Sequence, residues 1–387
     1  MDKLRRDPFR LYFPLGIFFL LWGILLWLPQ IWVAGDYPVL LHRSLVLNGF
    51  MASFIGGFLM TAAPRFSRTP GPSVAELAAL LLSILTAVAG GFLDSEIVVG
   101  LGSLAIGIVL LVFLVRRIIR RKANPPYSFI FLFVGLGLWI IAAVLSLWDA
   151  GMSEVKELQY HGAVMAIILG VGTRLLPGIL GHTEIVISQR ERYEGSAPFL
   201  STVPKLFFLL MGTYVVSFFL PGPWRPGLSA GVVLILALAY WKHWRLPKEK
   251  TALTLCLWTC AWLIVLSYVL RGAWPAGMIH GSHAFFINGL VLLSLLIATR
   301  VIRSHGHADP SFENRKTLYL TTGLIFLASV TRVTAYVFPE SYLHHLGYGS
   351  LLLSSGVILW SAQYLPLLWP GVTVPSPSPR SSKTLHP

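Results

Sequence analysis

The feature of this chain that most constrains its fold is a series of long apolar runs separated by short loops. A helix that crosses the hydrocarbon core of a membrane needs about 20 predominantly apolar residues. Breaks at Pro/Gly clusters and at charges divide the 387 residues into twelve such runs. The runs are 11–33, 42–63, 73–93, 97–115, 128–148, 158–180, 205–221, 227–242, 251–270, 281–300, 317–337 and 346–369. We therefore expect an all-α polytopic membrane protein with about twelve transmembrane helices and the lipid bilayer as its surroundings.

The charge of the chain agrees with this expectation. Only 12% of the residues are charged, against about 25% in soluble domains. The formal net charge is +14, which in a soluble protein would suggest nucleic acid as a partner. Here the cations lie in short loops between apolar runs, as the positive-inside rule expects. This distribution argues against nucleic acid binding.

The cations also predict an orientation. If the N-terminus is cytoplasmic, the loops on that side carry most of the Lys and Arg residues, and the opposite loops hold only Lys156, Arg225 and Arg271. Both termini are then cytoplasmic. We expect a single transmembrane domain over 1–370, followed by a Ser/Pro-rich disordered cytoplasmic tail over 371–387.

A repeat is marked by three histidines. His42, His161 and His280 follow one another at intervals of 119 residues, at the start of the second, sixth and tenth runs. Equal spacing of this kind is typical of an internal repeat. It predicts three pseudo-repeats of four helices, 1–122, 123–250 and 251–370, with helices 2, 6 and 10 gathered at the centre.

Four histidines are the leading candidates for chemistry: His42, His161, His280 and His283. Imidazole is a common ligand of haem iron and of copper, and it is neutral at pH 7. His280 and His283 are three residues apart, so they can share one helix face. The alternative is that each histidine lies at the headgroup level, where polarity is tolerated, and binds nothing.

A second group of candidates lies at the other ends of the same helices. Arg65, Arg174 and Arg300 follow a threonine there, and His182 and His305 come shortly after. These side chains could hold haem propionates or another anion. They could equally be interfacial anchors that satisfy the positive-inside bias, which is the interpretation we favour.

Three further polar residues lie inside the runs. Asn48 and Asn288 each stand next to a glycine, and a polar side chain in hydrocarbon usually faces the bundle. Either residue could make an interhelical hydrogen bond of about 1 kcal/mol or border a cofactor. Arg332 lies within the eleventh run. A charge there costs at least about 2.5 kcal/mol, so we expect it to face protein, water or a carboxylate.

The late segment with His283, Asn288-Gly289, Thr299-Arg300 and His305 resembles the NnrS family, as does Leu41-His42 through Asn48-Gly49 to Thr61-Ala62-Ala63-Pro64. The resemblance implies about twelve spans in a bacterial inner membrane, with b-type haem and copper as cofactors. It also implies a role in the nitric oxide response or in protection from nitrosative stress, with nitric oxide or another small diatomic molecule as ligand. Ser44 and Leu45 stand where the family usually has a second His and a Glu, which puts one metal ligand of the early helix in question.

Two other classes of function stay open at this point. Repeated helical units with polar residues in the spans also suit a cofactor-free transporter. The arrangement is similar to that of haem–copper oxidases too, in which histidines on helices 2, 6 and 10 hold metals. Those enzymes carry a histidine pair on helix 7, whereas run 205–221 has no histidine. If the chain is an enzyme, a divergent haem-dependent oxidoreductase is the expected class.

Overall fold

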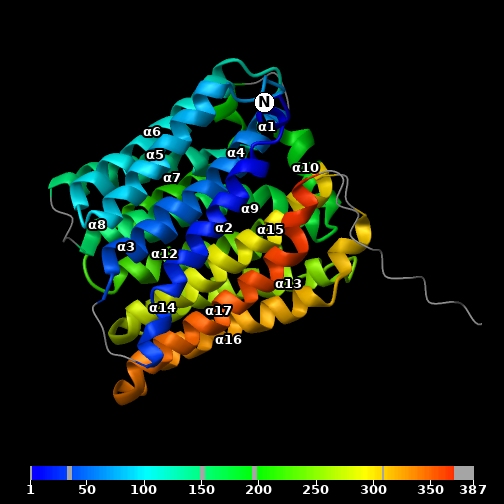
Figure 1. Cartoon of the computed structure of the whole chain (residues 1–387). Coiled ribbons are helices and arrows are strands. Elements are labelled where there is room, and N and C mark those ends of the chain that lie inside the picture. Colours follow the sequence, from blue (N-terminus) through cyan, green and yellow to red (C-terminus); the bar gives the residue numbers. More distant parts are fainter. Residues whose placement is uncertain (1, 33–36, 149–152, 194–197, 307–308, 370–387) are drawn as a thin grey trace, which may run out of the picture.

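The computed structural model describes residues 2–32, 37–148, 153–193, 198–306 and 309–369, and within these ranges every regular element is helical (Figure 1). The predicted tail 371–387 lies outside them. The helices of the first third are α1 (Asp2–Arg6), α2 (Phe9–Leu25), α3 (Val39–Arg43), α4 (Ala52–Ser67), α5 (Val74–Phe92) and α6 (Glu96–Ile119). The middle third has α7 (Ile130–Trp148), α8 (Ser153–Glu157), α9 (Val164–Ile179), α10 (Thr183–Tyr193), α11 (Lys205–Ser217) and α12 (Trp224–Ala239). The last third has α13 (Ala252–Ala273), α14 (Met278–Phe285), α15 (Leu293–Gly306), α16 (Thr317–Thr334) and α17 (Tyr342–Tyr364).

Nine helical stretches of the described residues are long and apolar enough to cross a membrane. The remaining three predicted spans correspond to the shorter apolar helices α2, α11 and α12, of 17, 13 and 16 residues. A helix of 13 residues is only about 20 Å long, whereas the hydrocarbon core is about 30 Å thick. Pro221 and Pro223 stand at the turn between α11 and α12, where Pro221 ends α11 early, and Pro226 lies in the first turn of α12. The count of twelve therefore stays a prediction.

Three of the nine stretches are much more buried than the others. They are Val39–Ser67, Glu154–Ile179 and Pro275–His305, whose most apolar windows are 83%, 67% and 83% buried. The other six windows are 33–56% buried. These three stretches carry His42, His161 and His280, so the helices predicted to be central are the interior ones of the bundle.

The remaining helices pack around these three interior helices in the order in which they follow one another along the chain. α6 packs against α7, α12 packs against α13, and α17 packs against α2, which brings the end of the bundle back to its beginning. This order agrees with three units around an axis. The pseudo-repeat boundaries themselves stay a prediction.

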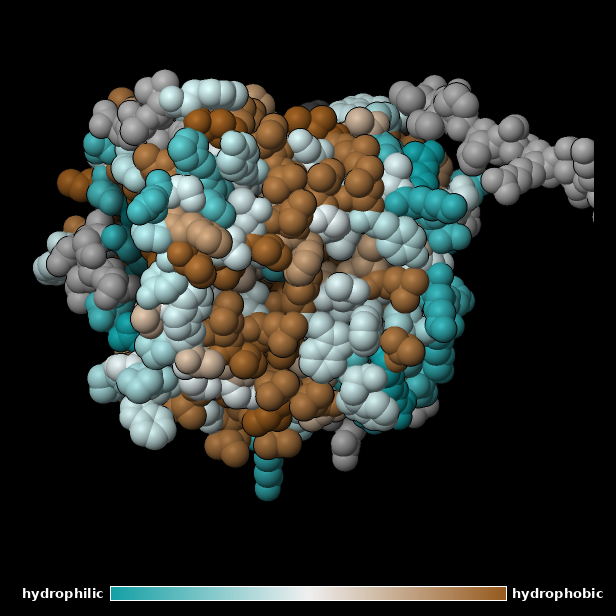
Figure 2. Space-filling view, turned by 90° about the horizontal axis from the view of Figure 1, so that it is seen from below, coloured by the Kyte–Doolittle hydropathy of each residue, from teal (hydrophilic) through white to brown (hydrophobic). Residues whose placement is uncertain are grey.

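The outer surface of the bundle is apolar. Leu82, Ile97 and Leu101 of α5 and α6 are among many large apolar side chains that are half or more exposed. Figure 2 shows one face with a continuous brown area down its middle and teal atoms toward its edges. An exposed apolar surface of this kind is what lipid contact requires.

Each interior helix contains a π-helical segment, in which the hydrogen bonds run one residue further than in an α-helix. The three segments are Ser44–Met51, Leu158–Ala163 and Phe286–Leu292. Each contains a glycine, and two of these glycines lie close to aromatic rings. A Cβ at Gly49 would lie 2.8 Å from Phe19, and one at Gly289 would lie 2.6 Å from Phe285. π turns in helices are frequently found at functional sites.

The closest helix contact gives a test of the packing. A Cβ at Gly102 of α6 would lie 2.3 Å from the backbone nitrogen of Ala87 on α5, whereas nothing lies within 4 Å of one at Gly137 of α7. We expect Gly102→Ala to destabilise the protein by about 1–3 kcal/mol, because the backbones must separate. Gly137→Ala, the control, should be neutral or stabilising by up to about 1 kcal/mol. Thermal unfolding in detergent measures both, and equal midpoints would contradict this packing.

Candidate functional site

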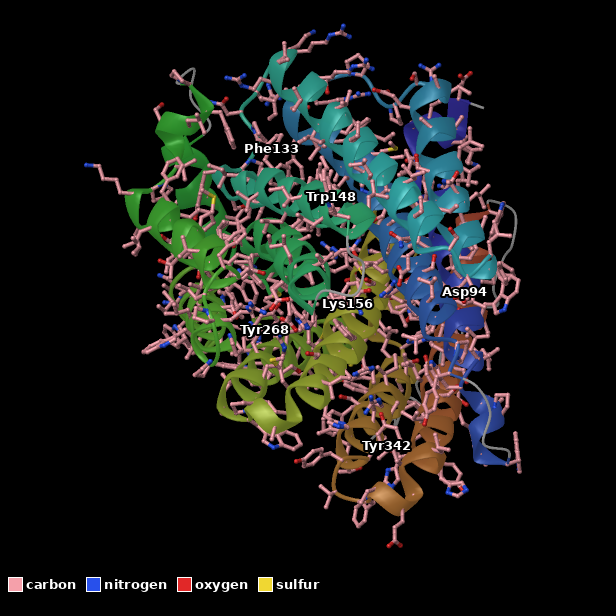
Figure 3. The ribbon with its side chains drawn as sticks, turned by 90° about the vertical axis from the view of Figure 1, so that its left-hand side faces the viewer. Asp94, Phe133, Trp148, Lys156, Tyr268 and Tyr342 are labelled. Carbon is pink, nitrogen blue, oxygen red and sulfur yellow. The ribbon has the colours of Figure 1, made fainter. Side chains whose placement is uncertain are left out.

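The predicted site residues separate into two groups at opposite ends of the bundle. Segments α3, α8 and α14, which carry or precede His42, His161 and His280, lie at the left-hand and lower end in Figure 1, opposite α1 and α10. We name this the histidine end. Figure 3 shows this side of the molecule, with Lys156, Tyr268 and Tyr342 labelled on three different parts of the chain.

At the histidine end the four candidate imidazoles gather around His283. His283 is close enough to His42 and His280 to interact with both electrostatically, and His161 interacts with His283 in the same way. The ring of Phe286 lies between two of them, with its centroid 5.0 Å from that of His161 and 5.6 Å from that of His283. The structure therefore brings together residues from all three interior helices.

Hydrogen bonds orient two of these rings in the same way. Nδ1 of His42 lies 2.8 Å from the carbonyl oxygen of Gly23, and Nδ1 of His283 lies 2.8 Å from that of Ile279. A carbonyl only accepts, so each Nδ1 carries the proton and each Nε2 keeps a free lone pair. A backbone carbonyl on Nδ1 is the usual partner of a histidine that ligates a metal through Nε2.

His161 is the most enclosed of the four. Its side chain is buried against Phe285, Phe286 and Tyr268, and its Nδ1 has no hydrogen-bond partner. Its backbone carbonyl accepts from the hydroxyl of Tyr214 at 2.7 Å. The π-helical segment alters the usual hydrogen-bond register at this position, so a side-chain hydroxyl can reach the carbonyl.

Both asparagines are buried on the π-helical segments. Asn288 donates through Nδ2 to Ser329 of α16 at 3.0 Å, which is the interhelical hydrogen bond expected of it. The Oδ1 atoms of Asn48 and Asn288 have no partner. Asn48 borders a small internal pocket of about 20 Å³ between α6 and the start of the second interior helix. A buried polar atom without a partner costs about 1–3 kcal/mol, so each marks a place where a further group would be stabilised.

His280 has a different environment, which depends on Arg332. Arg332 donates through Nη1 to Nδ1 of His280 at 2.9 Å and through Nη2 to the hydroxyl of Tyr342 at 3.3 Å. Nδ1 of His280 also lies 3.4 Å from the backbone carbonyl oxygen of Arg332. Because a guanidinium can only donate, Nδ1 accepts over the shorter contact and Nε2 of His280 carries the proton. A metal on Nε2 would have to displace that proton, so this contact does not favour His280 as a ligand.

Sequence reasoning missed one buried ion pair nearby. Arg271, predicted as an ordinary loop cation, is 1% exposed and pairs with Glu157. It also donates to the Ser282 hydroxyl at 2.9 Å. Glu157, one turn before His161 in sequence, is therefore engaged by Arg271. The position of Arg271 directly after an apolar run was a sequence signal of its burial, but nothing nearby in the sequence indicated its partner.

The opposite end does not form the ring of three arginines that was considered. Arg65 contacts His305, and it donates to Asp7 at 3.1 Å. Arg300 instead pairs with Glu313 at 2.6 Å, and Arg174 donates to the carbonyl of Val186 at 3.2 Å. Arg65 and His305 are thus brought together, in a contact that joins the N-terminal segment to α4 and α15.

Two buried imidazoles lie between the interior helix α9 and α13. His182 and His243 are 3% and 0% exposed, and they interact electrostatically with each other. Among the described residues, neither ring nitrogen of His182, nor Nδ1 of His243, has a hydrogen-bond partner, although Nδ1 of His182 lies 3.8 Å from Oε1 of Glu184. Burial lowers the pKa of both imidazoles, to about 4 for His243. Sequence reasoning identified His182 but not His243.

A metal ion without haem would need several His, Cys, Asp or Glu side chains close together. Among the described residues, no three His, Cys, Asp or Glu side chains are arranged so that they could hold one. A site of three or four imidazoles around copper is therefore not found there. A pair of imidazoles, as in the axial ligation of haem, does not require such a cluster.

Comparison with known proteins gives the family. The model of the NnrS protein family matches residues 3–370. The chain belongs to the NnrS family. The match extends well beyond the two segments that carried the resemblance and covers every helix described above. No curated protein matches the chain.

The pKa of His243 generates a test of its burial. In the unfolded chain histidine titrates near pH 6.5. Between about pH 6.5 and pH 4 the unfolded state therefore binds a proton at His243 more readily than the folded state does. The contribution of the neutral His243 imidazole to the free energy of unfolding is complete above about pH 6.5. It is lost as the pH falls toward 4. We expect the free energy of unfolding to fall by about 2 kcal/mol from pH 7 to pH 5 because of this residue.

His243→Gln is the matched variant, since it keeps a donor for the carbonyl of Trp258 and removes the titration. Unfolding midpoints at pH 7 and pH 5 should differ less for this variant than for the parent protein. His182 contributes to both proteins, so it cancels in the comparison. The same pH dependence in both would show that His243 is not buried as described.

Proposed function

We propose that this NnrS-family protein binds b-type haem at the histidine end and acts in the nitric oxide response or in protection from nitrosative stress. We also propose that it resides in the bacterial inner membrane with both termini in the cytoplasm, on the basis of the loop cations. The family match supports the membrane class of this proposal. The arrangement of the interior helices supports the proposal of haem binding at the histidine end.

One observation carries the proposal. Each of the three π-helical segments holds a buried polar atom that has no hydrogen-bond partner in the described part of the chain: Oδ1 of Asn48, Nδ1 of His161 and Oδ1 of Asn288. Native interiors rarely leave such atoms unpaired unless a water or ligand satisfies them. Their presence on all three interior helices favours a bound group between those helices.

The imidazoles favour haem as that group. His42 and His283 come from different interior helices, interact electrostatically, and each keep an Nε2 lone pair. We assign them as the residues that would hold the haem, with the carbonyls of Gly23 and Ile279 fixing the ring orientation. When bound, haem would supply an iron centre with affinity for nitric oxide or another diatomic molecule.

We do not assign copper to this site. Ser44 replaces a histidine that is usual in the family, and the described part of the chain offers no cluster of three suitable donors. His161 then has a supporting role, as a buried neutral imidazole beside Phe286. A cofactor-free transporter is the second candidate, since the polar atoms on the π-helical segments could instead border a substrate path.

A spectrum of the purified protein tests the proposal. We expect a Soret band and about one iron per chain, because two oriented imidazoles ligate haem strongly. His42→Ala and His283→Ala should each reduce the haem content several-fold. His345→Ala is the control, since its Nδ1 is held by the carbonyl of Thr331 and its ring stacks on Phe338.

The result separates the two candidates. A colourless protein that retains its fold, as judged by circular dichroism, would eliminate haem and favour the transporter. Haem that is retained in both variants would eliminate this pair as the ligands.

A further inference from the structure

A pocket at the histidine end is separate from the proposed imidazole pair. Its volume is about 590 Å³, within the range of small-molecule sites. Its walls include the exposed aromatic rings of Trp32 and Tyr336, and Glu340 stands exposed at its border. His280 and Tyr342 also line it. Neither His42 nor His283 does.

The polar groups of this pocket are fixed by Arg332 behind them. A guanidinium has only donors, so Nδ1 of His280 and the hydroxyl oxygen of Tyr342 must both accept from it. The Nε2–H of His280 and the O–H proton of Tyr342 are then both free to donate. Two residues that line one pocket therefore offer it hydrogen-bond donors, and each donor is polarised by a positive charge.

Among the described residues, no carboxylate is paired with Arg332. Arg332 is 8% exposed, and its only described side-chain partners are the neutral His280 and Tyr342. The other buried arginine at this end, Arg271, has Glu157. A buried charge without a partner is costly, so an anion in the adjoining pocket would be stabilised by Arg332 through the two donors.

The start of α17 adds further positive potential beside this pocket. Tyr342, Leu343 and His344 are its first three residues and line the pocket, and Ser341 before them provides no side-chain cap. The N–H of Tyr342 donates to the carbonyl of Pro339 in the preceding 3₁₀ turn, and this end of the helix carries partial positive charge. The negative charge of Glu340 opposes this positive potential, but the Glu340 side chain is exposed and its charge is screened by water.

We propose that this pocket binds a carboxylate on a flat apolar body, with the carboxylate accepting from His280 and Tyr342 and the apolar part against Trp32 and Tyr336. Carboxylate oxygens match two convergent donors, and a negative charge compensates Arg332. Such a carboxylate is carried by a free aromatic acid or by a porphyrin propionate. The site does not depend on haem ligation by His42 and His283.

Sodium benzoate is the probe, with benzamide as the neutral molecule of the same shape, at constant ionic strength. Calorimetric titration of the full-length protein in detergent should show saturable benzoate binding and at least tenfold weaker benzamide binding. Tyr342→Phe removes one donor and should weaken benzoate about tenfold, as expected for a hydrogen bond to a charged acceptor. Arg332→Gln should weaken it at least as much.

Tyr348→Phe is the matched control, because Tyr348 lies on the same helix, is 49% exposed and does not line the pocket. Its benzoate affinity should equal that of the parent protein, and thermal midpoints check that each variant folds. Benzoate that competes with haem loading would identify the propionate as the occupant, whereas binding to both haem-free and haem-loaded protein would identify a free acid. Equal affinity for benzoate and benzamide, or no effect of Tyr342→Phe and Arg332→Gln, would overturn the proposal.

Discussion

The rest of this structure depends on the requirement that backbone polar groups inside a membrane be satisfied by the protein itself. Regular helices meet it automatically, and the outer helices of the bundle do so. The three interior helices depart from the regular α-helical pattern, since each shifts into a π-helical segment. Such a departure is tolerated only where surrounding protein supplies partners, as the Tyr214 hydroxyl does for the carbonyl of His161. The irregular backbone and the buried polar atoms therefore occur together, in the most enclosed part of the molecule.

Two buried arginines at the histidine end illustrate different solutions to the same problem. Arg271 is neutralised by Glu157 and held by Ser282, so it connects the second and third interior helices as a structural element. Arg332 has only neutral partners. A buried cation compensated within the protein adds rigidity, whereas one without compensation favours an anion from outside. Arg332 contacts two residues, His280 and Tyr342, that line an open pocket.

The opposite end is closed by local polar contacts. Thr173 and Thr299 each accept a hydrogen bond from a tryptophan Nε1, of Trp241 at 3.0 Å and of Trp360 at 2.8 Å. Thr61 accepts from the backbone N–H of Phe9 at 3.3 Å instead. Together with the contacts of Arg65 with Asp7 and His305, these bonds fasten the ends of the interior helices to their neighbours. This end therefore has the features of a structural closure, and the proposed chemistry belongs to the histidine end.

The sequence by itself determined the class of the protein, the interior position of the helices that carry His42, His161 and His280, and their common end. Apolar run length and a regular interval are properties of the chain alone, and the bilayer converts them directly into helices of known length. Only the tertiary structure decided the partners: Arg65 with His305 but not with Arg174 or Arg300, Glu157 with Arg271, and Arg332 with His280. Successive residues of a helix point about 100° apart, so a partner depends on how each helix is rotated against its neighbours. Neither apolar length nor loop charge fixes that rotation, because it is set by side-chain packing between segments distant in the chain.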